Sequence, residues 1–224
     1  MRLSVVIPTL NEAEQIERTL ASVEAQAYLC EVIVADGGST DATRDRVAGR
    51  ATVIQSGAGR ARQMNAGAAQ ATGDVLLFLH ADTHLPPNAA QAIVAALADP
   101  AAEAGLFRLA FDQDTPLLRF YSFCTRFPSP RLGFGDRGLF VRRSTFEDVG
   151  GFPPISVFED LEMVWRLYQR GGLRFLSPRV VTSARRFARQ GALRLQLRNL
   201  YLWLHYLAGT DPERVAHLYR YDQR

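Results

Sequence analysis

The chain has 224 residues, 47% of them hydrophobic, a length that suits one α/β domain able to bury roughly 70% of the surface its unfolded form exposes. Its two cysteines, Cys30 and Cys124, match no metal or redox motif, which excludes a disulfide-rich scaffold and favours free thiols in a reducing compartment. The apolar stretch at residues 3–7 is too short for a signal-peptide core or a membrane span, so we expect a cytoplasmic protein.

The positive charge is carried by arginine alone and is unevenly spread. The formal net charge is +3, yet residues 166–224 hold twelve arginines against only Asp211, Glu213 and Asp222. Such a basic segment can face a diphosphate, an anionic acceptor or the inner surface of a membrane. Because no recognised nucleic-acid-binding motif accompanies it, we expect no nucleic-acid partner.

The first part of the chain alternates apolar strands with helices. Strands are predicted where short apolar runs stand between turn residues, at 3–7, 32–35, 52–55 and 75–79. Helices are predicted between them, beginning with one that Asn11 caps and continuing near 40–48 and at 59–71. This alternation predicts an α/β fold with a mostly parallel central sheet, helices on both faces and right-handed connections.

The second part adds helices and strands without an internal repeat or an interdomain linker. In chain order we expect a helix at 86–99, a strand at 104–111, an irregular aromatic helix at 115–127, a strand at 138–141 and a helix at 161–170. Residues 1–224 are therefore interpreted as a single domain.

The last long segment, residues 190–207, has a helical stripe of leucines. The stripe consists of Leu193, Leu197, Leu200, Leu204 and Leu207. The opposite side is also largely apolar, with Leu195, Leu202 and Tyr206. This pattern fits three placements, namely packing in a core, a homodimer seam or a membrane interface.

Four polar clusters are predicted to fall at the ends of strands. They are the stretches Pro8 to Glu12, Asp36 to Asp41, His80 to Thr83 and Phe158 to Asp160. Ligands of open α/β sheets bind in the crevice outside the carboxyl ends of the strands, so these clusters are expected to line one cleft. A carboxylate directly after a buried strand, such as Asp82, is suited to hold a divalent metal against a diphosphate. Nucleotide-sugar chemistry is therefore the first hypothesis.

Taken together, these clusters resemble the inverting family-2 glycosyltransferases with the GT-A fold, over about the first 165 residues. The stretches that carry the resemblance are Val6 to Glu12, Val34 to Asp41, Gly73 to Asp82 and Phe158 to Asp160. Four further stretches look more like one bacterial subgroup, associated with radical-SAM and selenodomain proteins and with arsenosugar biosynthesis. They are Gln63 to Gly67, Leu79 to Thr83, Gly135 to Gly138 and Ser183 to Phe187. The resemblance implies a nucleotide-binding half at about 1–110, an acceptor half at about 111–189 and a basic helical segment at 190–224.

The resemblance gives Asp36 the task of reading the nucleotide base. In the family, the matching aspartate accepts a hydrogen bond from the uracil N–H, which favours a UDP-sugar donor. Pro8 and Thr9 are expected beside it, with Glu12 near the base or the ribose. The alternative for Asp36 is an ordinary turn aspartate before Gly37 and Gly38.

The resemblance makes Asp82 the metal ligand. Mg²⁺ or Mn²⁺ prefers oxygen ligands, and such an ion can bridge the two phosphates and stabilise the leaving diphosphate. His80 stands where the family often has a first acid, so it contacts the metal, the ribose or neither. Ala81 is placed among the donor contacts. The alternative for Asp82 is again a turn aspartate.

Asp160 is the candidate general base, because inversion at the anomeric carbon requires the acceptor oxygen to lose its proton as it attacks. Glu159, its neighbour, is expected to orient the acceptor. The alternative for both acids is the amino-terminal turn of the helix at 161–170, where acids are favoured.

Six other side chains complete the predicted site. Arg60, Arg62 and Gln63 begin the small-residue helix, where backbone amides favour anions, and one of them is expected to contact the nucleotide. Asp136 lies in Gly135-Asp136-Arg137-Gly138, interpreted as a flexible loop near the acceptor. Arg185 and Arg186 are expected over the diphosphate. Surface charge is the alternative for all the arginines.

The sequence thus predicts a metal-dependent inverting glycosyltransferase whose acceptor is unknown. One rival is a sugar nucleotidyltransferase, but its phosphate-gripping loop is glycine-rich and residues 8–12 are not. The other rival is a non-catalytic nucleotide-binding or membrane-recruited module that uses the basic carboxyl-terminal helix. Donor hydrolysis or transfer would distinguish the enzyme from the module.

Overall fold

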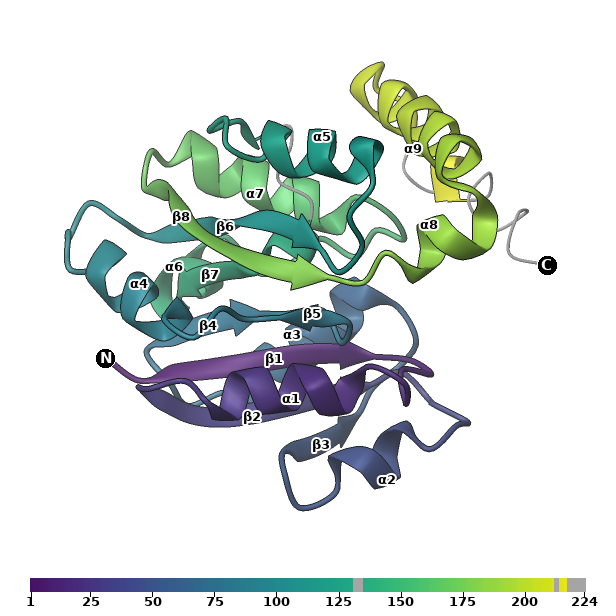
Figure 1. Ribbon diagram of the computed structural model, residues 1–224. Helices are drawn as coiled ribbons and strands as arrows, with labels where there is room; N and C mark the ends of the chain where they lie inside the picture. Colours follow the sequence, from purple (N-terminus) through teal and green to yellow (C-terminus); the bar gives the residue numbers. More distant parts are fainter. Residues whose placement is uncertain (131–134, 212–213, 217–224) are drawn as a thin grey trace.

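The computed structural model describes residues 1–130, 135–211 and 214–216. Within these residues eight strands form one sheet in the order β3-β2-β1-β4-β7-β6-β8-β5 (Figure 1). The strands are β1 (Leu3–Thr9), β2 (Leu29–Asp36), β3 (Thr52–Gln55), β4 (Val75–Phe78), β5 (Thr83–His84), β6 (Ala104–Phe111), β7 (Leu139–Arg142) and β8 (Leu173–Thr182). The helices are α1 (Ile16–Glu24), α2 (Thr43–Val47), α3 (Arg60–Gln70), α4 (Ala89–Ala96), α5 (Pro116–Cys124), α6 (Arg143–Asp148), α7 (Glu159–Gln169), α8 (Arg185–Gln190) and α9 (Ala192–Leu207), with a 3-10 turn at Gly135–Arg137.

Most strands of the sheet run in one direction. Strand β1 is parallel to β2 and β4, β2 is parallel to β3, and β6 is parallel to β8. Strand β7 is antiparallel to both of its neighbours, β4 and β6, and the short β5 is antiparallel to β8. The prediction of a mostly parallel sheet flanked by helices is therefore confirmed, with β7 and β5 as the reversed strands.

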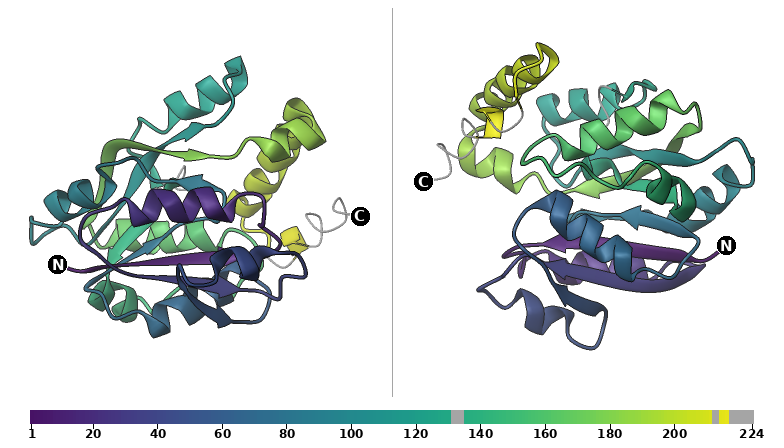
Figure 2. Two further views of the ribbon diagram at one scale, coloured as in Figure 1. Left: turned by 60° about the horizontal axis from the view of Figure 1, so that its bottom comes forward. Right: turned by 180° about the vertical axis from the view of Figure 1, so that it is seen from behind.

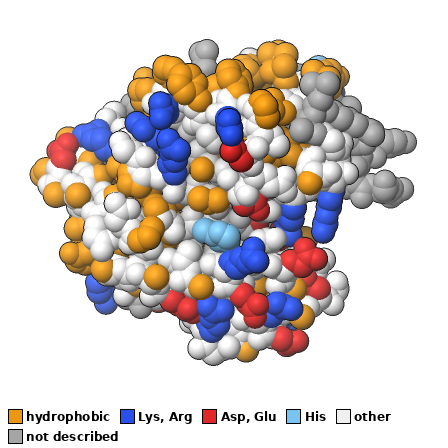
Figure 3. All heavy atoms as spheres, in the orientation of Figure 1, with side chains coloured by type: hydrophobic (Ala, Val, Ile, Leu, Met, Phe, Trp, Pro, Cys, Tyr) orange, Lys and Arg blue, Asp and Glu red, His pale blue; other side chains and the backbone are white. Residues whose placement is uncertain are grey.

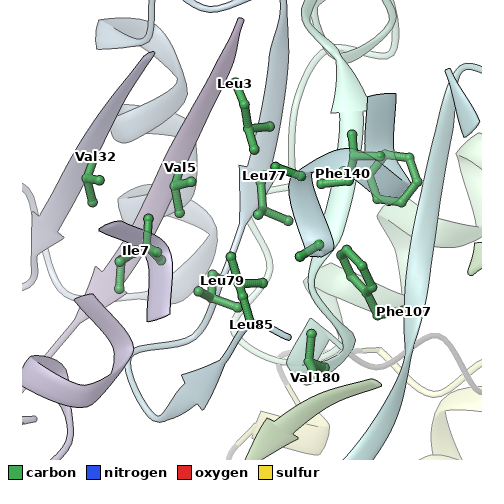
Figure 4. Packing of buried hydrophobic residues seen from close by; sticks show 14 of the residues in the cluster. Leu3, Val5, Ile7, Val32, Leu77, Leu79, Leu85, Phe107, Phe140 and Val180 are labelled. Atoms are coloured by element: carbon green, nitrogen blue, oxygen red, sulfur yellow. The ribbon is translucent and has the colours of Figure 1, made fainter. Parts of the chain in front are cut away.

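Helices cover both faces of the sheet because successive residues of a strand point to opposite sides. In β1, Val5 and Ile7 pack in one apolar cluster with α1 and α4, and Figure 4 shows the strand residues of this cluster. Val6 points to the other face and packs in a second cluster with α3, α6 and α7. Figure 2 shows α3 and α7 on the face opposite to α1. Strands covered on both faces read as continuous apolar runs, which is why the sequence indicated them clearly.

One capping prediction is wrong. Helix α1 begins after Gln15, and no side chain caps it. Asn11 instead has a positive φ of 55° and accepts a hydrogen bond from the Thr40 amide at 2.9 Å. Its side chain therefore joins the loop after β1 to the loop after β2.

Four elements were not predicted, namely β5, α6, α8 and β8. Strand β8 contains Arg174, Ser177, Pro178 and Arg179, so it has no continuous apolar run. The segment at 115–127 was predicted as an irregular helix. It contains the regular helix α5, whose first turn is capped by the Thr115 hydroxyl accepting from the Leu118 amide.

Helix α9 packs on the rest of the protein through the side opposite to the predicted leucine stripe. Leu195 and Leu202 are buried, and the Tyr206 hydroxyl donates to Glu162 of α7 at 3.0 Å. Leu197, Leu200, Leu204 and Leu207 are exposed, so the placement of this stripe in the core is wrong; the side chain of Leu193 lies outside the described residues. None of the described helices is both long and apolar enough to cross a membrane.

Candidate active site

The predicted polar clusters meet at one edge of the sheet. Thr9 and Asp36 are register partners at the carboxyl ends of β1 and β2. Because β7 is antiparallel to β4, it is the start of β7 that lies at this edge, with Leu139 opposite Phe78. Strand β8 also ends here, with Thr182 opposite Thr83. The strand directions therefore bring together the segments around Glu12, Asp82, Asp136 and Arg185.

Arg185 joins two of the predicted donor-site acids. Its guanidinium pairs with the Glu12 carboxylate and lies 3.9 Å from Oδ2 of Asp82. The Ser183 amide donates to the Asp82 carbonyl at 3.1 Å, which ties the end of β8 to the turn after β4. Burial raises the pKa of Glu12, although Arg185 opposes the shift. Arg186 follows on α8 with an exposed side chain and acts electrostatically on Glu12 and His80.

A second ion pair holds the acids at the start of α7. Arg60 Nε at the beginning of α3 lies 2.8 Å from Oε1 of Glu159, whose side chain is 1% exposed. Burial raises the pKa of Glu159 to about 7, while the charge of Arg60 opposes this shift. Asp160 is buried beside it and lies within electrostatic range of His80 and Asp136.

Asp136 and His80 lie between these two ion pairs. Burial, together with the charges of Asp160 and Asp82, raises the pKa of Asp136 to about 7, and Oδ1 of Asp136 is buried without a hydrogen-bond partner among the described residues. Burial and the charge of Arg60 lower the pKa of His80, so its imidazole is neutral at neutral pH. Asp82 and Asp160 thus both lie within electrostatic range of Asp136.

The region around Asp136 is not the flexible loop that was predicted. Residues Gly135–Arg137 form a 3-10 turn, followed by Gly138 with a positive φ of 63°. Arg137 is 1% exposed, and it donates to the Phe107 carbonyl at 2.9 Å and to the Thr125 carbonyl at 3.2 Å. Burial lowers the pKa of Arg137 to about 10. This buried arginine fixes the turn that presents Asp136, a role that the motif alone did not reveal.

Asp36 sits in a tightly bonded turn. Its carboxylate accepts from the Ser39 hydroxyl, from the Gly38 and Ser39 amides, and from Arg44 Nε at 2.8 Å. Burial alone would raise the pKa of Asp36, but these hydrogen bonds outweigh it and hold the pKa below its usual range. The carboxylate is therefore an ionised acceptor at neutral pH. Arg44, eight residues later, was not predicted as part of the site.

Two of the predicted contact residues have structural partners within the protein. Gln63 is buried and its Nε2 donates to the Thr9 carbonyl at 2.7 Å and to the Ala35 carbonyl at 2.8 Å. Gly37 is needed here, since a Cβ at this position would lie 3.0 Å from Gln63 Nε2. Ala81 packs in the core and its carbonyl accepts from Thr19, so its side chain does not face a ligand.

The other predicted residues differ in their surroundings. Pro8 and Thr9 are buried at the end of β1, and the Thr9 hydroxyl has no hydrogen-bond partner among the described residues. Arg62 is exposed on α3 near Gly57, away from the Arg60 ion pair. Of the arginines at the start of α3, it is Arg60 that joins the acidic cluster.

The acids fit a divalent metal that is shared with a ligand. No three His, Cys, Asp or Glu side chains gather as a metal cluster in the described ranges. Mg²⁺ is usually bound by one or two carboxylates together with substrate phosphates. Asp82 supplies a carboxylate at the edge, and the unpartnered Oδ1 of Asp136 lies in the same acidic region. This ligand set suits an ion that a diphosphate completes.

Comparison with known proteins agrees with this geometry. Residues 4–155 match the family model described as "Glycosyl transferase family 2". Glycosyltransferase AglE of Haloferax volcanii is 29% identical over 171 residues, covering 67% of this chain and 56% of that protein. Validoxylamine A glucosyltransferase of Streptomyces hygroscopicus subsp. jinggangensis is 39% identical over 110 residues, covering 44% of this chain and 26% of that protein.

Solved structures share the fold. The mannosyltransferase PcManGT of Pyrobaculum calidifontis, in complex with GDP-Man and Mn²⁺, superposes with a TM-score of 0.67 at 24% identity, over 94% of this chain and 64% of that one. Glucosyl-3-phosphoglycerate synthase of Mycobacterium tuberculosis, in complex with Mn²⁺ and UDP, gives 0.67 at 18% identity, over 94% and 81%. The chain spans about a quarter to a third of the length of the first curated relatives it matches. The fold is of the GT-A type, and the chain belongs to glycosyl transferase family 2.

Proposed function

We propose that this protein transfers a sugar from a nucleotide-diphosphate sugar to an acceptor oxygen with inversion at the anomeric carbon. One observation carries the proposal: Asp36, Asp82 and Asp160 lie at the same edge of the sheet. At this edge Arg60 pairs with Glu159, the neighbour of Asp160, and Arg185 lies near Asp82. In related structures the bound donors are UDP-GlcNAc and GDP-Man, which supports a nucleotide sugar as the class of donor.

The donor end of the site is built from strands β1, β2 and β4. Asp36, ionised at neutral pH, is proposed as the acceptor for an N–H of the base, and the sequence resemblance favours uracil as that base. Asp82 is the metal ligand, and Mg²⁺ or Mn²⁺, when bound, neutralises the charge that develops on the diphosphate. Arg185, which lies near Asp82, and its neighbour Arg186 would form two-point contacts with phosphate oxygens.

The acceptor end is built from the start of α7. Asp160 takes the proton of the acceptor hydroxyl while the oxygen forms its bond to the anomeric carbon and the bond to the diphosphate oxygen breaks. Glu159 is held by Arg60 and positions the backbone of this turn. His80, neutral and within electrostatic range of both Asp82 and Asp160, would lie between donor and acceptor.

The proposal is tested by calorimetric titration of UDP and GDP, each with and without Mn²⁺, on wild type and on Asp82→Ala. We expect metal-dependent binding of one nucleotide that disappears in the variant. Asp45→Asn, an exposed acid on α2, serves as a matched control and should bind as wild type. A folded wild-type protein that binds neither nucleotide would contradict the proposal and favour the non-catalytic module.

Three finer points rest on the sequence, namely the subgroup, the division of the chain and the cellular location. The similarity to the subgroup associated with radical-SAM proteins and arsenosugar biosynthesis suggests the pathway in which to look for the acceptor. The division into a nucleotide half, an acceptor half and a basic segment, and the placement of the protein in the cytoplasm, are part of the same proposal.

A nucleotidyltransferase would instead release diphosphate from a nucleoside triphosphate and a sugar phosphate, and an assay with those substrates distinguishes it.

A further inference from the structure

Two helices present large apolar side chains to solvent at the same end of the molecule. On and after α5 these are Phe120, Phe123 and Phe127, which are 60%, 50% and 55% exposed. On α9 they are Leu197, Leu200, Tyr201, Leu204 and Leu207. Figures 1 and 2 place α5 and α9 at one end of the protein, and Figure 3 shows hydrophobic side chains gathered along that end. We call these eight residues the apolar rim.

Helix α9 is built to expose this surface. Residues 197, 200, 201, 204 and 207 recur at spacings of three and four, which places them on one side of the helix. The other side is already occupied, because Leu202 packs with Val157 and Val215, and the Tyr206 ring lies 4.9 Å from the Phe158 ring. The exposed stripe is therefore a second apolar face, beyond the one that folding uses.

Arginines accompany the rim. A pocket of about 300 Å³ under α5 is lined by Phe123 and by three arginines, Arg119, Arg126 and Arg179. Asp114 pairs with Arg119, so Arg126 and Arg179 supply the net positive charge of the pocket. Arg126 also lies over the Phe123 ring, with its guanidinium carbon 5.6 Å from the ring centre. Arginine side chains are visible beside the hydrophobic end in Figure 3.

We propose that the apolar rim docks on the surface of an anionic lipid bilayer, with the pocket under α5 taking lipid phosphate groups. Exposed leucines and aromatic rings enter the boundary between headgroups and acyl chains, while arginines attract anionic lipids. A second copy of the chain fits this surface less well, because a twofold contact through the rim would bring the arginines that accompany it, Arg126 and Arg179, towards their own copies.

This inference rests on the proposed function and extends it to the acceptor. Helix α9 contacts the beginning of α7 through Tyr206 and Glu162, two residues after Asp160. A protein docked through the rim would therefore hold the acceptor end of its site near the bilayer. That position suits an acceptor whose hydroxyl or phosphate is carried on a lipid.

The test is co-flotation of the purified full chain with vesicles of phosphatidylcholine, with and without phosphatidylglycerol. We expect binding to the phosphatidylglycerol vesicles that weakens as salt rises. The double variant Leu197→Ser/Leu204→Ser should lose about tenfold or more in affinity, because two membrane-inserting side chains are removed. Arg126→Gln/Arg179→Gln should lose about 25-fold, because each basic group contributes about fivefold near an anionic surface.

Matched controls use exposed residues outside the rim. Tyr28→Ser/Val53→Ser removes exposed apolar side chains, and Arg18→Gln removes an exposed arginine; both should float as wild type. Three outcomes would each overturn the inference. The first is equal binding to both vesicle types, and the second is binding that no rim variant weakens. The third is a wild-type dimer, seen by light scattering, that Leu197→Ser/Leu204→Ser converts to a monomer. Nucleotide titration of the same variants separates the two proposals, because docking can fail while donor binding is retained.

Discussion

The Arg60 guanidinium lies 2.8 Å from the carboxylate of Glu159 and joins the start of α3 to the start of α7. Glu159 is almost fully buried, so the cation of Arg60 is the group that favours its ionised form. Through this pair, the helix that follows β3 holds the turn that carries Asp160. One ion pair thereby fixes the starts of two helices against each other.

Removing Arg60 should destabilise the protein more than removing the whole pair. Arg60→Gln leaves a buried carboxyl without its cation, and we expect a loss of about 1–3 kcal/mol in the free energy of unfolding. The loss is smaller than for a fully buried pair because Arg60 is partly exposed. The double variant Arg60→Gln/Glu159→Gln should recover most of the lost free energy. Urea unfolding at neutral pH measures both. If the double variant were as unstable as Arg60→Gln, the loss of stability would not come from leaving Glu159 without its cation.

Asp136 should make stability depend on pH. Its folded pKa, about 7, lies above its ordinary value of 3.8, so the folded state binds more protons between these values and stability falls as pH rises through that window. A difference of one between the folded and unfolded pKa is equivalent to about 1.4 kcal/mol in the free energy of unfolding. Asp136→Asn should therefore unfold at higher urea than wild type at pH 8 and lose that advantage at pH 4. Asp45→Asn, on the exposed surface of α2, should follow the wild-type profile at both pH values.

Asp160 should matter for turnover and not for donor binding. Asp160→Asn keeps the size of the side chain and removes the proton acceptor, so we expect a fall in kcat of about 10² to 10⁴-fold with nucleotide affinity within a factor of about two of wild type. The measurement pairs a turnover assay with calorimetry. Asp148→Asn, an exposed acid at the end of α6, is the control. Undiminished kcat in Asp160→Asn would remove its role as the base.

Gly67 should be required for the close approach of α3 to β1. A Cβ at Gly67 would lie 2.3 Å from Cγ1 of Val6, so Gly67→Ala forces the helix away from the sheet, at a cost of about 1–3 kcal/mol. Gly67→Ala/Val6→Ala should regain part of the loss, because the shorter side chain makes room. Gly57→Ala, where the new Cβ meets only ordinary contacts, should unfold near the wild-type urea concentration. Coincident unfolding curves for wild type and Gly67→Ala would contradict the packing argument.

Strands β1, β2 and β4 were predictable because they are covered on both faces and therefore read as unbroken apolar runs. Asp36 and Asp82 could be placed because each closely follows such a run. Strand β8 was not predictable, since arginines and a proline interrupt its pattern. The link from Arg185 to Glu12 joins residues 173 positions apart, a distance at which local pattern carries no information.

The buried arginine at 137 illustrates the same limit of local pattern. In sequence it stands between two turn glycines and looks exposed, yet it is 1% exposed and holds carbonyls of β6 and of the segment after α5. Only the tertiary fold supplies those acceptors. The outward direction of the α9 leucines is a second case, because both sides of that helix are apolar and periodicity alone does not choose between them.

The reversal of β7 gives the chain a natural site for diversification. Strand β6 ends at Phe111 and β7 begins at Leu139, both at the edge where the clustered acids lie. The connection between these two strands therefore begins and ends at that border. Its first part, around α5, can lengthen or shorten without shifting any strand register, whereas Asp136 and Arg137 at its end belong to the site. Evolution or engineering could thus vary the segment around α5 while Asp136 and the strand ends stay in place.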